Sequence, residues 1–156
     1  MKNIITTVLI AVTLYSCTST VHLEKKVYCQ GKTLQGDCLV QSTGVGKNND
    51  TGQISAIQNA LYSVIFVGIE TSGSFSCPKY PLFNVNENKC ADCKAKIEGL
   101  ISSGELNEFI TSPNNYFVDG QSRVKTDGGY RLTYTLIVDR DRLRKFLENK
   151  NLIMPL

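Results

Sequence analysis

The sequence is poor in histidine, with a single one among 156 residues. That histidine, His22, lies in a polar and charged stretch at 18–26 that we interpret as a tether. Acid–base and nucleophilic mechanisms most often use histidine, and one histidine in a tether is a poor general base. We therefore expect no catalytic residue, and we predict that the protein is not an enzyme.

The sequence also gives no sign of a membrane-spanning helix at its start. The apolar run at 4–15 follows Lys2 and is shorter than the roughly 20 residues that cross a bilayer. A basic residue, a short apolar core and small residues are typical of a secretory signal peptide. The sequence therefore predicts a signal peptide at 1–16.

The end of this run, Leu14-Tyr15-Ser16-Cys17, resembles a bacterial lipobox. The resemblance implies cleavage between Ser16 and Cys17 and a lipid on Cys17. Two or three buried acyl chains hold a protein on a membrane without a spanning segment. We expect a lipidated tether at 17–26, one folded domain at 27–156, and a place in the cell envelope. Lipoproteins of this kind usually lie on the periplasmic face of the outer membrane, and we expect this location here.

Charge of one sign is not in large excess. The formal net charge is +3, and removing 1–16 takes away only Lys2, leaving about +2. This charge is too small to indicate a nucleic-acid partner. One basic group stands near the end, Arg140, Arg142, Arg144 and Lys145. It either keeps a terminal helix soluble or meets anionic lipid headgroups or an acidic partner.

Cysteine, in contrast, is frequent, with six residues. An exported protein uses cysteines as disulfides, and five remain once Cys17 carries lipid. Cys29 and Cys38 flank a stretch with two glycines, so we expect them to pair. Cys77 is expected to bond to Cys90 or Cys93 and to staple the loop between them. The odd thiol is either free or links two chains.

Two other interpretations of the cysteines remain open beside structural disulfides. Cys90 and Cys93 have C-x-x-C spacing, and a helix N-terminus near Cys93 would stabilise a thiolate. A thioredoxin-like site, however, needs a βαβ context, and no such pattern precedes it. A zinc site from Cys77, Cys90 and Cys93 lacks an evident fourth ligand. We favour structural disulfides, and we expect neither a metal nor another cofactor.

The order of expected elements begins with extended segments at 27–28 and 34–43 and a strand at 38–46. Apolar residues at three- and four-residue steps predict a long buried helix from about Gly52, capped by Asp50 or Thr51 and ended by Gly68. The irregular stretch that follows holds one short strand at 80–85. Shorter helices are expected at 94–102 and 105–110.

The strongest strand signal comes later, around Asp127-Gly128-Gly129. This sequence between two extended runs predicts a tight hairpin. Alternation along 130–138 places Tyr130 and Tyr134 on the buried face. A terminal helix capped by Asp139 follows. The order predicts an α+β fold with a three-stranded antiparallel sheet around one long helix, a disulfide-stapled insertion at 72–93 and a C-terminal helix.

Two segments carry a resemblance to a known family, VQSTGVGKNNDTGQISAIQNALYSVIFVGI at 40–69 and YRLTYTLIVDRDRLRKFLENKNLI at 130–153. A strand that ends in glycines and leads into an alanine-spaced helix resembles the dodecin-like fold of small bacterial envelope lipoproteins. It is also similar to the amino-terminal module of flagellar assembly lipoproteins. The resemblance implies an assembly or binding component with no shared catalytic residues.

These observations together favour a lipid-anchored, non-catalytic envelope protein that joins an assembly or binds a protein partner. A homo-oligomer is an equally open form of that assembly, because exposed sheet edges pair readily. One alternative is a module that binds a small ligand or a cell-wall component in a cleft beside the insertion. The other alternative is a thiol-redox protein that uses Cys90 and Cys93.

Overall fold

The computed structural model describes residues 27–71, 77–84, 90–112 and 123–155. The predicted signal peptide, the tether, Ser16, Cys17 and His22 lie outside the described residues. Parts of the predicted insertion, at 72–76 and 85–89, also lie outside them.

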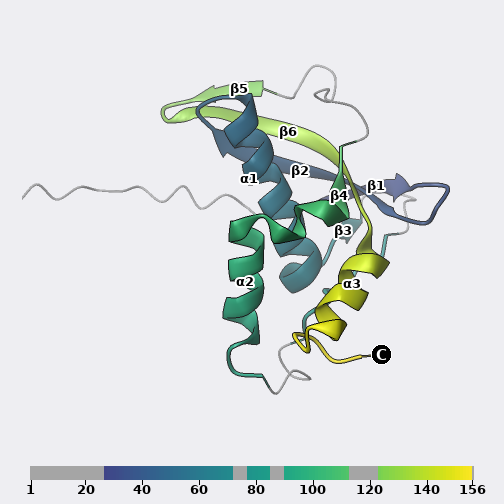
Figure 1. Ribbon diagram of the computed structural model, residues 1–156. Helices are drawn as coiled ribbons and strands as arrows, with labels where there is room; N and C mark the ends of the chain where they lie inside the picture. Colours follow the sequence, from purple (N-terminus) through teal and green to yellow (C-terminus); the bar gives the residue numbers. More distant parts are fainter. Residues whose placement is uncertain (1–26, 72–76, 85–89, 113–122, 156) are drawn as a thin grey trace, which may run out of the picture.

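The described chain has an α+β fold, as predicted, in which helices cover one face of a mixed sheet (Figure 1). The strands are β1 Tyr28–Lys32, β2 Cys38–Gly46, β3 Glu70–Thr71, β4 Ile110–Thr111, β5 Arg123–Thr126 and β6 Gly129–Val138. The helices are α1 Asn49–Tyr62, α2 Cys93–Ser103 and α3 Arg140–Asn149. A π-helix at Ser63–Val67 continues α1, and a 3₁₀ helix at Glu105–Phe109 follows α2.

The predicted three-stranded antiparallel sheet around a single long helix is wrong. Among the residues that the structure describes, the sheet has six strands in the order β3-β1-β2-β6-β4, with β5 also paired to β6. The β1–β3 pair is parallel, so the sheet is mixed. Strands β3 and β4 have two residues each, which is too short to produce an alternating pattern. They join the sheet through tertiary contacts, such as the bond from Glu70 N to Val27 O at 2.9 Å.

The centre of the sheet is the long antiparallel pair of β2 and β6. It runs without a register break from Cys38 opposite Val138 to Gly46 opposite Tyr130. The predicted strand at 38–46 and the hairpin at Asp127-Gly128-Gly129 are confirmed. Alternate side chains point inward, and Tyr134 is buried as predicted. Tyr130 is only partly buried, because it lies next to the turn between β5 and β6. The guanidinium carbon of Arg123 lies over its ring, 3.8 Å from the ring centre.

Helix α1 begins earlier than predicted. Asn48 is its N-cap, since its side chain accepts a hydrogen bond from Thr51 N at 2.9 Å, whereas a cap at Asp50 or Thr51 was expected. Thr51 completes a capping box with Asn48. An asparagine in extended conformation satisfies the free N–H groups of a first turn.

The end of the helical segment agrees with the prediction, because Gly68 closes it with a φ of 100°. The last helical carbonyls are satisfied by a distant segment. Leu82 N and Phe83 N donate to Val64 O and Ile65 O at 3.1 and 2.8 Å. This pairing replaces the short strand predicted at 80–85, of which the described residues form none.

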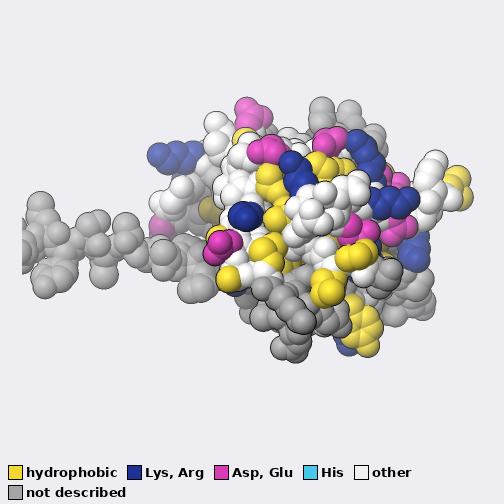
Figure 2. Space-filling model, turned by 60° about the horizontal axis from the view of Figure 1, so that its bottom comes forward, with side chains coloured by type: hydrophobic (Ala, Val, Ile, Leu, Met, Phe, Trp, Pro, Cys, Tyr) yellow, Lys and Arg dark blue, Asp and Glu magenta, His cyan; other side chains and the backbone are white. Residues whose placement is uncertain are grey.

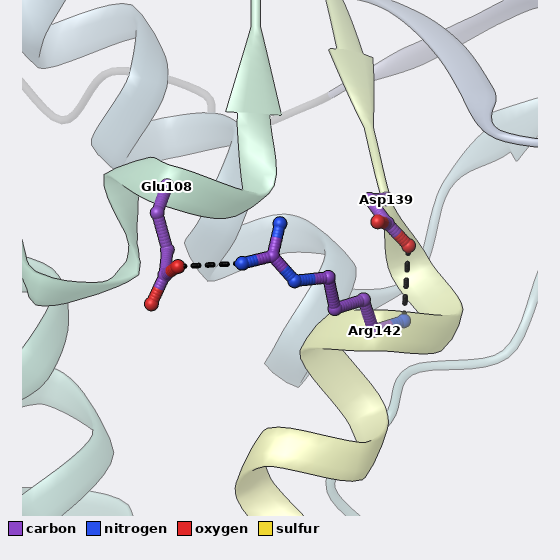
Figure 3. A network of polar contacts seen from close by, with 3 residues as sticks. All are labelled: Glu108, Asp139 and Arg142. Atoms are coloured by element: carbon purple, nitrogen blue, oxygen red, sulfur yellow. Dashed lines mark hydrogen bonds and ion pairs between the residues drawn. The ribbon is translucent and has the colours of Figure 1, made fainter.

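Helices α2 and α3 lie on either side of the lower end of the α1 segment in Figure 1. The predicted Asp139 cap of α3 is confirmed, because its carboxylate accepts from Arg142 N at 3.0 Å. Figure 3 shows that Arg142 reaches in the other direction to Glu108 of the 3₁₀ helix, at 2.7 Å. These contacts fix α3 beside the segment that follows α2.

Candidate functional site

One disulfide joins the edge of the sheet to the insertion. Cys29 of β1 bonds to Cys77, 48 residues away, so the expected Cys29–Cys38 pair is wrong. The register explains the difference, because a bulge between Cys29 and Gly31 places Lys32, not Cys29, opposite Cys38. Both bonded residues are buried, and this bond is part of the core.

The second disulfide closes a short turn at the start of α2. Cys90 bonds to Cys93, so the expected bond from Cys77 to either of them is also wrong. The turn brings the two residues together, with a Cα–Cα distance of 5.3 Å and a bond from Cys93 N to Cys90 O. The two ends differ: Cys90 is exposed, while Cys93 is 1% exposed.

Cys38 is the free cysteine of the described residues, and it is buried. Burial raises the pKa of its thiol, and the neighbouring charge of Arg140 acts in the opposite direction. The Arg140 guanidinium donates to Tyr80 O at 2.9 Å. A thiol with 2% exposure does not face solvent, so the folded domain offers no route for Cys38 to link two chains.

The buried sulfur of Cys93 lies 3.6 Å from the carbonyl oxygen of Asn151. Asn151 follows α3 and has a positive φ of 54°. Leu152 N donates to Leu147 O and Asn151 N donates to Glu148 O, which together form a Schellman-type helix end. The end of α3 is thereby held against the beginning of α2.

A groove runs between α2 and the residues that follow α3. This groove, which we call the α2–C-terminal groove, has a volume of about 490 Å³ and is lined by Lys96, Gly99, Leu100, Lys150 and Leu152. Its lining combines apolar side chains with two lysines. Figure 2 shows the face at the lower end of the molecule, where apolar side chains lie among basic and acidic ones.

A second groove lies on the other side of α2. The α1–α2 groove has a volume of about 320 Å³ and is lined by Gln58, Asn59, Tyr62, Glu98, Ile101 and Ser102. Its lining is more polar, although Asn59 already donates to Thr43 O at 2.7 Å. Helix α2 is therefore a ridge with a groove on each flank and a disulfide at its N-terminus.

The basic group near the end of the chain is partly engaged within the domain. Arg142 pairs with Glu108, and Arg144 pairs with Glu148, each at 2.7 Å. Arg140 contacts Tyr80 O. Three of the four basic side chains thus have internal partners, which weakens the case for a free cationic patch.

Neither a metal cluster nor a membrane-spanning helix is found within the described ranges. No group of three or more His, Cys, Asp or Glu side chains in them could hold a metal ion. None of the helices in that part of the chain has the length and apolarity to cross a bilayer.

Comparison with known proteins gives no match to any family model, curated protein or solved structure. The candidate site therefore depends on its own geometry. Sequence reasoning singled out Cys90 and Cys93 but missed both grooves, because each is formed by segments that pack together only in the fold. The Asn151 carbonyl was missed for the same reason, although an asparagine after an amphipathic helix is a recognisable helix-end signal.

Proposed function

We propose that this chain is a lipid-anchored envelope protein whose folded domain binds a protein partner. The signal-peptide pattern and the lipobox residues Leu14 to Cys17 support the anchor. Two disulfides in the described domain support an oxidising compartment outside the cytoplasm. The periplasmic face of the outer membrane is the side that we propose.

The α2–C-terminal groove is the observation that carries the binding function. It is open and of ligand size. Its apolar side chains, Leu100 and Leu152, offer contact area, and Lys96 and Lys150 add positive charge. A polypeptide segment that combines apolar and acidic residues complements this lining. Such docking needs no catalytic group and no cofactor. The resemblance of 40–69 and 130–153 to envelope assembly lipoproteins agrees with this role.

The anchor is tested by intact-mass spectrometry of the protein extracted from its native membrane. We expect a mass that lacks residues 1–16 and carries acyl chains on Cys17. A Cys17→Ala variant should be unacylated, whereas a Thr20→Ala variant should match the parent. An uncleaved, unacylated parent protein would overturn the anchor and the proposed location.

The groove is tested with a photo-crosslinking amino acid placed at Lys96, inside the groove, and at Leu34 as control. Leu34 is fully exposed, at 103%, and is absent from the groove. We expect one discrete adduct from position 96 in intact cells, lost in a Leu100→Glu variant, and none from position 34. An adduct made of two copies of this chain would show that the groove binds a second copy, and the proposal of a different protein partner would be overturned in favour of a homo-oligomer. Identical adducts from both positions would overturn the groove as the binding site.

The polar lining of the α1–α2 groove favours a second candidate, a small polar ligand such as a cell-wall fragment. Gln58, Glu98 and Ser102 supply hydrogen-bonding groups and Tyr62 supplies an aromatic ring. Soluble peptidoglycan fragments should then perturb the NMR signals of these residues, and a Ser102→Leu variant should abolish the effect. Perturbation at α2–C-terminal groove residues alone would overturn this candidate.

A further inference from the structure

The Cys90–Cys93 disulfide differs from the other disulfide of the described residues in its access to solvent. Cys29 and Cys77 are both buried, at 0% and 7% exposure. Cys90 is exposed, and its partner Cys93 is buried. An external thiolate therefore has one sulfur within reach, that of Cys90, with Cys93 behind it as the leaving group.

The surroundings of Cys93 are suited to the reduced form. The Asn151 carbonyl oxygen lies 3.6 Å from the Cys93 sulfur. In the disulfide this sulfur carries no proton, so the carbonyl receives no bond from it. In the dithiol the Cys93 thiol has an acceptor already in place, which favours the protonated form. The Schellman-type end of α3 fixes that carbonyl.

The start of α2 leaves Cys90 outside the helix. That helix has eleven residues and begins at Cys93, three residues after Cys90. The N-cap residue Asp92 makes no side-chain hydrogen bond to the first turn, and that turn contains no acidic residue. Cys90 therefore stands clear of the helix, where an external thiolate can approach it, and the free N–H groups of the first turn lie on the Cys93 side.

The geometry points to Cys90 and Cys93 as a site of thiol–disulfide exchange with a dithiol of an exported protein. A thiolate of that protein attacks Cys90 Sγ, and the Cys90–Cys93 bond breaks. The electron pair leaves on Cys93 Sγ, which takes a proton from solvent and then donates to Asn151 O. A mixed disulfide now joins Cys90 to the partner.

In the second half of the exchange, the other thiolate of the partner attacks its own sulfur in the mixed disulfide. A disulfide forms in the partner, and Cys90 leaves as a thiolate. Two electrons have passed from the partner to this chain, and the partner's two thiol protons have gone to solvent. Cys90, like Cys93 before it, takes a proton from solvent, and the pair is then a dithiol. One turnover needs no other oxidant, and a small-molecule disulfide such as oxidised glutathione restores the starting state.

The α2–C-terminal groove is the place where the partner would bind beside the disulfide. This step rests on the proposed function. Lys96 is three residues after Cys93, so the groove starts about one helical turn from the disulfide. A dithiol segment flanked by apolar and acidic residues would occupy the groove and present its sulfur to Cys90.

The first test equilibrates the full-length protein in detergent with glutathione buffers and counts free thiols by alkylation and mass spectrometry. We expect Cys90 and Cys93 to be reduced at glutathione ratios that leave Cys29–Cys77 oxidised. A Cys93→Ala variant should accumulate a glutathione adduct on Cys90, whereas Cys90→Ala should leave Cys93 unmodified. Equal resistance of both disulfides to reduction, or an adduct on Cys93, would overturn the exchange site.

The role of the Asn151 carbonyl is tested by substitutions that keep or disfavour the backbone conformation of residue 151. Asn151→Gly keeps the positive φ and the carbonyl, and should leave the reduction equilibrium unchanged. Asn151→Val disfavours that φ and should shift the equilibrium about fivefold toward the disulfide, the effect of losing roughly one hydrogen bond. No shift in the valine variant would overturn the role of this carbonyl in holding reduced Cys93.

The partner's path is tested with two reduced dithiol peptides, one flanked by Glu and Leu and one flanked by Lys and Leu. We expect the acidic peptide to be oxidised about tenfold faster, with the preference lost in Lys96→Glu/Lys150→Glu. Exchange with glutathione but no peptide preference would overturn the groove and leave the exchange site standing. Peptide binding without any exchange would overturn the exchange site and leave the groove standing.

Discussion

Gly44 of β2 lies against Gly52 of α1, so closely that a Cβ atom on Gly44 would clash with the Gly52 carbonyl oxygen. Next to this contact, Ser42 donates from its hydroxyl to Ala56 O at 2.8 Å. The glycines therefore let the helix backbone rest on the sheet. This contact sets the depth at which α1 is buried.

We expect Gly44→Ala to lower the free energy of unfolding by about 3 kcal/mol. The added methyl group meets backbone atoms of Gly52 and Ala56, which move less easily than a side chain, and overpacking typically costs about 1–3 kcal/mol. Urea unfolding of the oxidised protein measures the change.

Gly99→Ala is the matched control. A Cβ at Gly99, within α2, meets no atom within 4 Å, and replacing glycine inside a helix adds about 0.5–1 kcal/mol of stability. Opposite signs for the two variants are the expected result. A Gly44→Ala protein as stable as the parent would show that α1 does not rest on β2 in this way.

Local sequence signals predicted those parts of the fold that depend on neighbouring residues. The hairpin at Asp127-Gly128-Gly129 and the Asp139 cap follow from turn and cap chemistry a few residues long. The Cys29–Cys77 bond spans 48 residues, and β3 and β4 are only two residues long. Such features form through tertiary packing, and no local pattern encodes them.

The candidate site, too, could be predicted only where neighbouring residues in the sequence define it. The spacing of Cys90 and Cys93 marked a redox pair or a metal ligand pair in the sequence, whereas the unequal exposure of the two residues required the fold. The α2–C-terminal groove joins Leu100 of α2 to Leu152, which lies in the segment after α3. Periodicity describes each segment alone, and so it does not predict a groove between them.

The two polar contacts drawn in Figure 3 should differ in their contribution to stability. Asp139→Ala removes the N-cap of α3 and should lower the free energy of unfolding by about 1 kcal/mol. Glu108→Gln removes the ion pair with Arg142, whose side chains are 52% and 59% exposed, and should cost less than about 0.5 kcal/mol. Thermal unfolding at low and high salt compares them. A larger loss for Glu108→Gln would contradict this ranking.

Cys38 should make stability fall at alkaline pH. Its thiol pKa is raised in the folded state above 9.0, mainly by burial, despite the opposing charges of Arg140 and Lys32. Below pH 9 the thiol is protonated in both states and adds no slope. Above it the unfolded thiol releases its proton first, so the free energy of unfolding decreases as pH rises toward the folded pKa.

Unfolding by urea at pH 8 and pH 9.8 measures this effect. The decrease should be smaller in Cys38→Ala. Tyr134 also has a raised pKa, owing to burial and to Asp50, and contributes in the same direction above pH 10. Tyr134→Phe is therefore the control that should keep the loss between pH 8 and 9.8. An unchanged slope in Cys38→Ala would show that its thiol is not held protonated by the fold.

The two disulfides should contribute unequally to stability. Cross-linking 29 to 77 closes a loop of about 49 residues, and the chain-entropy relation gives roughly 4 kcal/mol for it, against roughly 2 kcal/mol for the four-residue loop at 90–93. Cys29→Ala/Cys77→Ala also removes two buried sulfurs from the core. We expect this double variant to lose at least 2 kcal/mol more than Cys90→Ala/Cys93→Ala.

Urea unfolding of the two double variants beside the parent measures the difference, with the residual Cys38 thiol blocked after unfolding to prevent exchange. An exposed disulfide of small structural value can be reduced without unfolding the domain, which is what an exchange site requires. Equal losses in the two double variants would contradict this. They would mean that Cys90–Cys93 supports the fold as strongly as Cys29–Cys77, and reduction of the exposed bond would then be coupled to loss of the groove beside it.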